Sequence, residues 1–116
     1  MTRILPTLAL GTALALPGLA AADAAAPVLA IISHPVEDYA RWRGVYDDFR
    51  DEQVAGGVTG AEVFRDPADP NRVVVVHRFA SVDAADAFLG SETLRAAMGD
   101  AGVAAPPEVT IVEAAD

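Results

Sequence analysis

The 116-residue sequence contains no cysteine and no lysine, and each absence excludes a class of chemistry. Without cysteine the chain has no thiolate nucleophile, no disulfide, no cysteine-bound iron–sulfur cluster and no lipid anchor through cysteine. All eight basic residues are arginines, which excludes Schiff-base formation, covalent pyridoxal phosphate and a P-loop lysine. Any catalysis therefore depends on His, Tyr, Trp, Arg or a bound ligand.

Positive charge is scarce as well. The eight arginines are outnumbered by 17 acidic residues, and the formal net charge is −9. Because nucleic-acid binding requires clustered positive charge, nucleic acid is not an expected partner. The length allows one compact domain.

The N-terminal segment has the pattern of a secretory signal peptide. Arg3 precedes an uncharged apolar run, a Pro17-Gly18 break and the small residues Ala20, Ala21 and Ala22. We expect residues 1–22 to be the signal peptide, with cleavage near residues 22–24, and residues 23–27 to be a short linker. The mature protein would be periplasmic or secreted, with one domain over residues 28–116 and no stable membrane insertion. A retained membrane anchor is the alternative, because residues 4–22 carry no charge.

The mature chain alternates between apolar runs and turn signals in the order β-α-β-β-α-β. Ser81 and Ser91 are expected to cap two helices. The expected elements are strand 28–33, helix 35–54 ending at Gly56-Gly57, strand 58–65, a turn at 66–71, strand 72–79, helices 82–89 and 92–98, and strand 109–112. This order predicts an α+β, ferredoxin-like antiparallel sheet with its helices on one face.

Two of these strands predict a homodimer. Strands 28–33 and 72–79 are apolar at consecutive positions, so both faces of the sheet need to be covered there. The helices of this topology cover one face only. We therefore expect a second copy to pack its sheet against the other.

The first helix carries four of the chain's seven aromatic residues on one side. At 100° per residue, Tyr39, Trp42, Tyr46 and Phe49 share an arc of about 80°, which Arg43 borders. The arc could be an ordinary buried stripe. Alternatively, because two hydroxyls and an indole N–H need partners when buried, it could form one wall of a ligand pocket. In that case Tyr39, Trp42, Arg43, Tyr46 and Phe49 are the candidate ligand-binding residues.

The two histidines, His34 and His77, are the candidate catalytic residues. We expect both at the same end of the sheet, on the assumption that strands 28–33 and 72–79 run parallel. They could be structural, or they could serve a small-molecule pocket as hydrogen-bond donors or as a proton-transfer base. A shared metal or haem site is a third possibility, but no metal ligand is predicted because no motif such as H-E-x-x-H is present.

Three segments resemble a known family. Residues 34–47, 75–79 and 84–88 are similar to the first helix, third strand and second helix of small dimeric α+β-barrel proteins. These proteins are related to the antibiotic-biosynthesis monooxygenases and are often described as cyclase-like; the wider superfamily includes haem-degrading members. The resemblance implies a paired ferredoxin-like protomer with a cavity between sheet and helices. It does not carry over a chemistry: the monooxygenases of this fold react an activated aromatic substrate with oxygen without metal or flavin, using Trp, Tyr, His or Asn near the ligand, and Trp42, Tyr46, His34 and His77 are residues of such types. The only asparagine, Asn71, lies in the expected turn.

The main expectation is an exported, homodimeric protein that binds a small aromatic or apolar molecule without a cofactor. One alternative is a cofactor-independent monooxygenase or cyclase acting on a polyketide-like or quinol substrate. A haem-binding domain and a non-catalytic dimerisation module are the others.

Overall fold

The computed structural model describes residues 27–115 of the chain. The predicted signal peptide lies outside the described residues. The elements in chain order are β1 (Val28–Pro35), α2 (Tyr39–Asp48), α3 (Arg50–Ala55), β2 (Gly60–Arg65), β3 (Arg72–Phe79), α4 (Val82–Leu89), α5 (Glu92–Asp100) and β4 (Glu108–Glu113). Within residues 27–115, none of the helices has the length and apolar character needed to cross a membrane.

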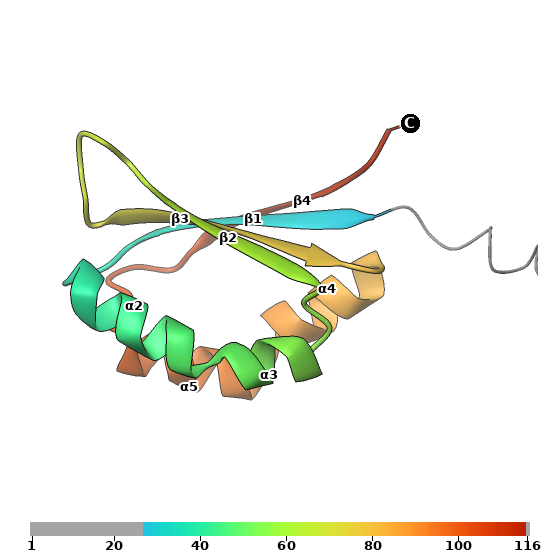
Figure 1. The fold of residues 1–116 in the computed structure, drawn as a ribbon, viewed down its shortest axis with the longest axis horizontal. Helices are drawn as coiled ribbons and strands as arrows, with labels where there is room; N and C mark the ends of the chain where they lie inside the picture. The colour runs from blue at the N-terminus through green and yellow to red at the C-terminus, as the bar shows by residue number, and fades with distance from the viewer. Residues whose placement is uncertain (1–26, 116) are drawn as a thin grey trace, which may run out of the picture.

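The four strands form one sheet in the order β2-β3-β1-β4, with every neighbouring pair antiparallel. All the helices lie on the same side of this sheet (Figure 1). The expected ferredoxin-like α+β fold is confirmed. The two predicted caps are present, since the hydroxyl oxygens of Ser81 and Ser91 accept the backbone N–H groups of Ala84 and Leu94 at 3.1 and 3.2 Å.

The expectation that strands β1 and β3 are parallel was wrong. Their register pairs Ala30 with His77 and His34 with Val73 in antiparallel order. After β1 the chain reverses direction when it enters the helical segment, again when it enters β2, and again when it enters β3. This odd number of reversals makes β1 and β3 antiparallel. His34 and His77 therefore share the helix-covered face but lie four residue steps apart along it, about 13 Å.

The first helix begins later than predicted. Pro35 is the last residue of β1, and its carbonyl accepts the N–H of Ala104 at 2.9 Å. Asp38 is the N-cap of α2 and its carboxylate accepts the N–H of Arg41 at 3.0 Å. Pairing with the β4 side of the molecule therefore keeps Pro35 extended, although its ring suits a helix start. The predicted single helix also divides at Phe49 into α2 and α3, and the chain then turns at Gly57 with φ +101°.

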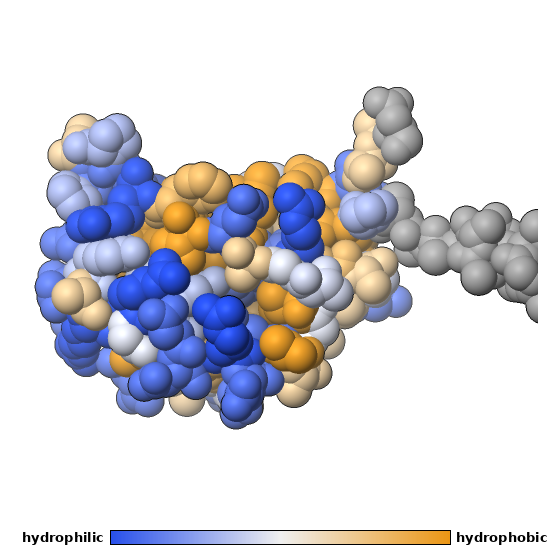
Figure 2. All heavy atoms as spheres, viewed as in Figure 1, coloured by the Kyte–Doolittle hydropathy of each residue, from blue (hydrophilic) through white to orange (hydrophobic). Residues whose placement is uncertain are grey.

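The two faces of the sheet differ in burial. Side chains facing the helices form the core with Trp42 and Phe88; these core side chains from the sheet are Val28, Ala30, Ile32, Val73, Val75 and Phe79. The opposite face carries alternate residues that are half-buried or exposed: Leu29, Ile31, Phe64, Val74, Val76 and Val112. Of these, Phe64 is 51% exposed. Figure 2 shows hydrophobic side chains at the top of the molecule, on the sheet side, and mostly hydrophilic ones along the lower left.

Candidate functional site

A cavity of about 290 Å³ lies between the sheet and helices α2, α4 and α5. Five of the seven predicted site residues line it: His34, Trp42, Tyr46, Phe49 and His77. The sheet contributes its floor through Ile32 and Val75, and α5 contributes its outer wall through Leu94 and Met98. The aromatic arc of the first helix is thus both a packed stripe and a cavity wall.

A continuous row of rings crosses the cavity wall from one histidine to the other. His34 meets Trp42 edge-on at a centroid distance of 5.8 Å. Trp42 stacks on Tyr46 at 4.8 Å with 22° between the ring planes, and Tyr46 stacks on His77 at 6.0 Å. Because such offset and edge-on arrangements are favourable, the row forms a continuous, packed aromatic wall beside the cavity.

The best-defined polar contact of the site joins Tyr46 to His77. The Tyr46 hydroxyl lies 3.0 Å from Nε2 of His77. Burial lowers the pKa of His77 to about 4. Burial also raises the pKa of Tyr46, although the positive charges of Arg43 and Arg50 oppose this. At neutral pH both partners are uncharged, so the Tyr46 hydroxyl can donate its proton in this bond to Nε2 of the neutral imidazole.

His34 occupies the other end of the row and has a separate environment. It is 3% exposed, and burial lowers its pKa. Its Nδ1 atom is buried without a hydrogen-bond partner, as is Nδ1 of His77. His34 and His77 lie about 13 Å apart along the sheet, which is too far for both rings to bind one metal ion or haem iron. This separation excludes the shared metal or haem site considered from the sequence. Across residues 27–115, no group of three or more potential metal-binding side chains comes together.

The site does not fit haem iron at His77. The Nε2 atom that would bind iron is already bonded to the Tyr46 hydroxyl, and Nδ1 is enclosed by protein. Haem ligation would therefore break the best-defined polar contact of the cavity.

Two predicted ligand-binding residues, Tyr39 and Arg43, do not line the cavity. The Arg65 guanidinium covers the Tyr39 ring, 3.8 Å from its centroid. Nε of Arg43 donates to Asp47 at 3.1 Å. Both residues lie at the edge of the aromatic arc.

The sequence reasoning missed several cavity residues, and Gln53 is the most informative. Its side chain is 5% exposed and it lines the cavity from α3. Gln53 lies two helical turns after Tyr46, so the same helical projection would have placed it on the aromatic side. It supplies a buried carboxamide. Asn71 instead supports the start of α2, because its Oδ1 accepts the backbone N–H of Tyr39 at 3.1 Å, outside the cavity.

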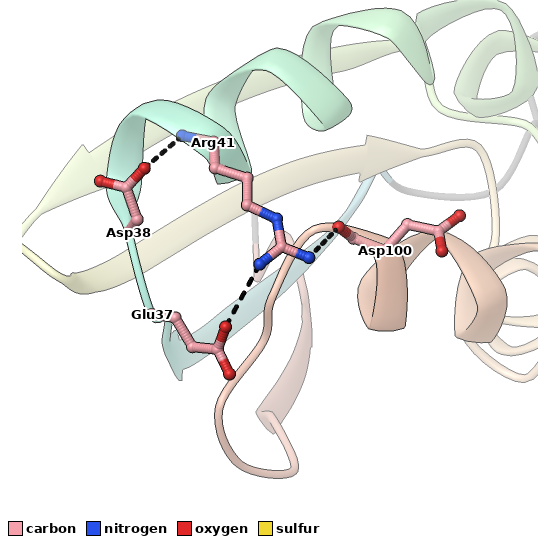
Figure 3. A network of polar contacts seen from close by, with 4 residues as sticks. All are labelled: Glu37, Asp38, Arg41 and Asp100. Carbon is pink, nitrogen blue, oxygen red and sulfur yellow. Dashed lines mark hydrogen bonds and ion pairs between the residues drawn. The ribbon is translucent and has the colours of Figure 1, made fainter.

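An arginine holds the outer wall of the cavity to the first helix. Nη2 of Arg41 donates to the carbonyl oxygen of Asp100 at 2.9 Å, and Nη1 lies 3.3 Å from a carboxylate oxygen of Glu37 (Figure 3). The backbone N–H of Glu37 donates to the carbonyl of Gly102 at 2.9 Å. Because carbonyls at a helix C-terminus attract positive charge, this arrangement fixes the C-terminal end of α5 beside the start of α2.

The fold and the cavity together define a small-molecule-binding protein with a ferredoxin-like α+β fold. The family model described as antibiotic biosynthesis monooxygenase matches residues 33–100. The chain belongs to this family. No curated protein sequence matches the chain.

Solved structures share the fold at low sequence identity. A candidate antibiotic biosynthesis monooxygenase from Bordetella bronchiseptica is 20% identical with a TM-score of 0.68, covering 77% of this chain and 97% of that one. SnoaB from Streptomyces nogalater, described as a cofactor-independent oxygenase, is 16% identical with a TM-score of 0.65, covering 79% and 96%. Rv0793 from Mycobacterium tuberculosis is 24% identical with a TM-score of 0.59, covering 78% and 96%.

Proposed function

We propose that this protein binds a small, flat aromatic molecule in the cavity and oxygenates it directly with dioxygen, without a metal or flavin. The observation that carries the proposal is the Tyr46–His77 hydrogen bond in the wall of a mainly aromatic and apolar cavity. Family membership and the similarity to the cofactor-independent oxygenase SnoaB support it.

The lining favours an uncharged, ring-shaped ligand. Its walls are mainly rings and aliphatic side chains, and it contains no carboxylate side chain. The uncharged polar side chains of the lining are Tyr46, Gln53, Ser91 and the two imidazoles; its one charged side chain, Arg95, is 74% exposed and lies 3.9 Å from a carboxylate oxygen of Glu92. A flat ligand can lie beside the Trp42–Tyr46 pair while its hydroxyl or carbonyl group reaches Tyr46.

The Tyr46–His77 pair can remove the proton that oxygenation requires. As a hydroxyl of the ligand gives its proton to the Tyr46 oxygen, Tyr46 passes its own proton to Nε2 of His77. The ligand becomes an electron-rich anion, which reacts with dioxygen to form a carbon–oxygen bond. The imidazolium of His77 then returns the proton by the same path to the peroxide anion.

The Tyr46→Phe variant tests the proton path. We expect oxygen uptake with a panel of aromatic quinols to fall by about 10²- to 10⁴-fold, the usual contribution of a positioned acid–base group. Binding should be retained, because the ring and its stacking on Trp42 remain. Quenching of tryptophan fluorescence measures that binding directly, since Trp42 is the only tryptophan.

Asp83→Asn is the matched control, since Asp83 lies on the exposed side of α4 and does not line the cavity. It should leave oxygen uptake unchanged. Undiminished uptake in Tyr46→Phe would exclude the proposed proton path, and absence of quinol binding in the unaltered protein would exclude the proposed ligand class.

We also propose that two copies pair through the open face of the sheet. The support is its half-buried and exposed apolar residues, which none of the helices within residues 27–115 covers. Val76 lies near the middle of this face, opposite Ile31 in the register. Removing such a surface from water is the main force that drives association.

Val76→Arg is expected to make the protein monomeric in light scattering, because a buried unpaired charge is costly at such an interface. Ala96→Arg, the same change at an exposed position of α5, should remain dimeric. A monomer for the unaltered protein at micromolar concentration would refute the pairing.

We further propose that the protein is exported to the periplasm or secreted. The charge and apolar pattern of residues 1–22 is the support. Intact-mass measurement of the protein recovered from its native host should show a chain beginning between residues 23 and 25. Recovery of a chain that retains residues 1–22 in the membrane fraction would favour the anchor instead.

A further inference from the structure

The most easily oxidised rings of this chain lie together on one helix. The sequence has one tryptophan and two tyrosines, and all three are in α2: Tyr39, Trp42 and Tyr46. Their spacing of three and four residues places them on one side of the helix. The sequence has no cysteine, and within residues 27–115 the only methionine is Met98, which lines the cavity.

These three rings connect the cavity to the outer end of the helix. Tyr46 lines the cavity and stacks on Trp42 at a centroid distance of 4.8 Å. Trp42, which is buried, lies 5.9 Å from Tyr39. Tyr39 is outside the cavity, half-buried and covered by the Arg65 guanidinium. Each step is a direct ring-to-ring contact, the arrangement that allows an electron to pass between neighbouring rings.

The inner end of the row has a proton acceptor in place. A phenol that loses an electron becomes a strongly acidic radical cation. It forms a stable neutral phenoxyl radical only if a nearby base accepts its proton. Nε2 of His77, 3.0 Å from the Tyr46 hydroxyl, can accept this proton. The proton can return by the same bond when Tyr46 is reduced again.

We propose that Tyr46, Trp42 and Tyr39 form an electron relay that carries a one-electron oxidation from the cavity to the protein surface. An oxidising radical in the cavity, such as an organic peroxyl radical, takes one electron from Tyr46 and becomes the corresponding peroxide anion, and the Tyr46 proton moves to His77. An electron then passes from Tyr39 through Trp42 to Tyr46, and the proton returns from His77 to the Tyr46 oxygen. Tyr39 releases its hydroxyl proton to water and remains as a neutral phenoxyl radical.

The relay would protect the cavity wall. Without it, a radical formed beside the ligand would oxidise the nearest side chain, including Met98. At Tyr39 the same oxidising equivalent is within reach of reductants in solution. The relay requires only a radical in the cavity, so it does not depend on the oxygenation proposed above.

A photo-oxidant tests the relay without any knowledge of the natural ligand. Menadione is a small apolar quinone whose excited state takes one electron from tyrosine or tryptophan, and quenching of Trp42 fluorescence measures its binding. After illumination with a nitroso spin trap present, peptide mass spectrometry locates the trapped radical. In the unaltered protein we expect the adduct on Tyr39.

Two conservative variants make the result specific. In Trp42→Phe the middle of the relay can no longer be oxidised, so the adduct on Tyr39 should be lost and one on Tyr46 should appear. In Tyr39→Phe the end of the relay is removed, and the transient absorption of a tryptophanyl radical should persist longer than in the unaltered protein. An equal yield of the Tyr39 adduct in Trp42→Phe, or no adduct on Tyr39 in the unaltered protein, would overturn the relay.

Discussion

Trp42→Ala is expected to lower the free energy of unfolding by about 3–5 kcal/mol, the cost typical of removing a buried aromatic side chain. Trp42 is 3% exposed and contacts the rings of His34, Tyr39 and Tyr46. The variant therefore enlarges the existing cavity and removes the centre of the aromatic row. Urea denaturation followed by circular dichroism measures the change, because the variant has no tryptophan fluorescence.

Trp42→Phe is the control for this prediction. It keeps a ring at the same position, so its loss of stability should be clearly smaller. Protein concentration has to be equal in all samples, because under the proposed pairing of two copies the apparent stability depends on it. A loss below about 1 kcal/mol in Trp42→Ala would show that α2 closes over the missing ring instead of leaving a cavity.

Acid is expected to destabilise the protein between pH 6.5 and pH 4 by about 3 kcal/mol through His77 alone. Burial lowers the pKa of His77 from 6.5 to about 4 in the folded protein. In this interval the unfolded chain binds a proton at His77 that the folded protein does not. Stability is therefore full above pH 6.5 and falls as the pH decreases toward 4. His34, whose pKa burial also lowers, adds a contribution of the same sign.

His77→Gln isolates the contribution of this histidine. Glutamine does not titrate, so the free energy of unfolding of the variant should depend less steeply on pH between 6.5 and 4. Urea denaturation at several pH values measures both slopes. Parallel slopes for the variant and the unaltered protein would mean that His77 is protonated in the folded state as readily as in the unfolded chain.

Local sequence signals predicted most of the fold. The valine run of β3 and the helix of α4 have the expected bounds, because alternation of burial and serine capping are local properties. The start of α2 was misplaced because Pro35 and Val36 are bonded to residues distant in the chain. Val36 donates to the carbonyl of Asn71 and pairs with Val103. No local pattern of residues 35–38 contains that information.

Only the wall of the candidate site formed by the first helix could be predicted from the sequence, because helical periodicity shows which residues share a face of that helix. The helical projection found Trp42, Tyr46 and Phe49 because they occupy one face of one helix. The outer wall on α5 could not be found this way, since α5 has no buried residue and its residues meet the cavity only through the tertiary packing that Arg41 and Asp100 help to hold. The relation between His34 and His77 depended on strand direction, which is a property of the whole sheet.

The central position of β1 has a consequence for how the chain folds. Val28, the first residue of this strand, pairs with Phe79 in β3 and with Glu113 in β4, so the earliest strand is completed by one of the last segments of the sequence. Long-range pairing of this kind slows folding, because the entropy of closing large loops is lost before the contacts form. During synthesis the core cannot close until the C-terminal residues are available. A chain built in this way therefore stays unfolded until its synthesis is nearly complete.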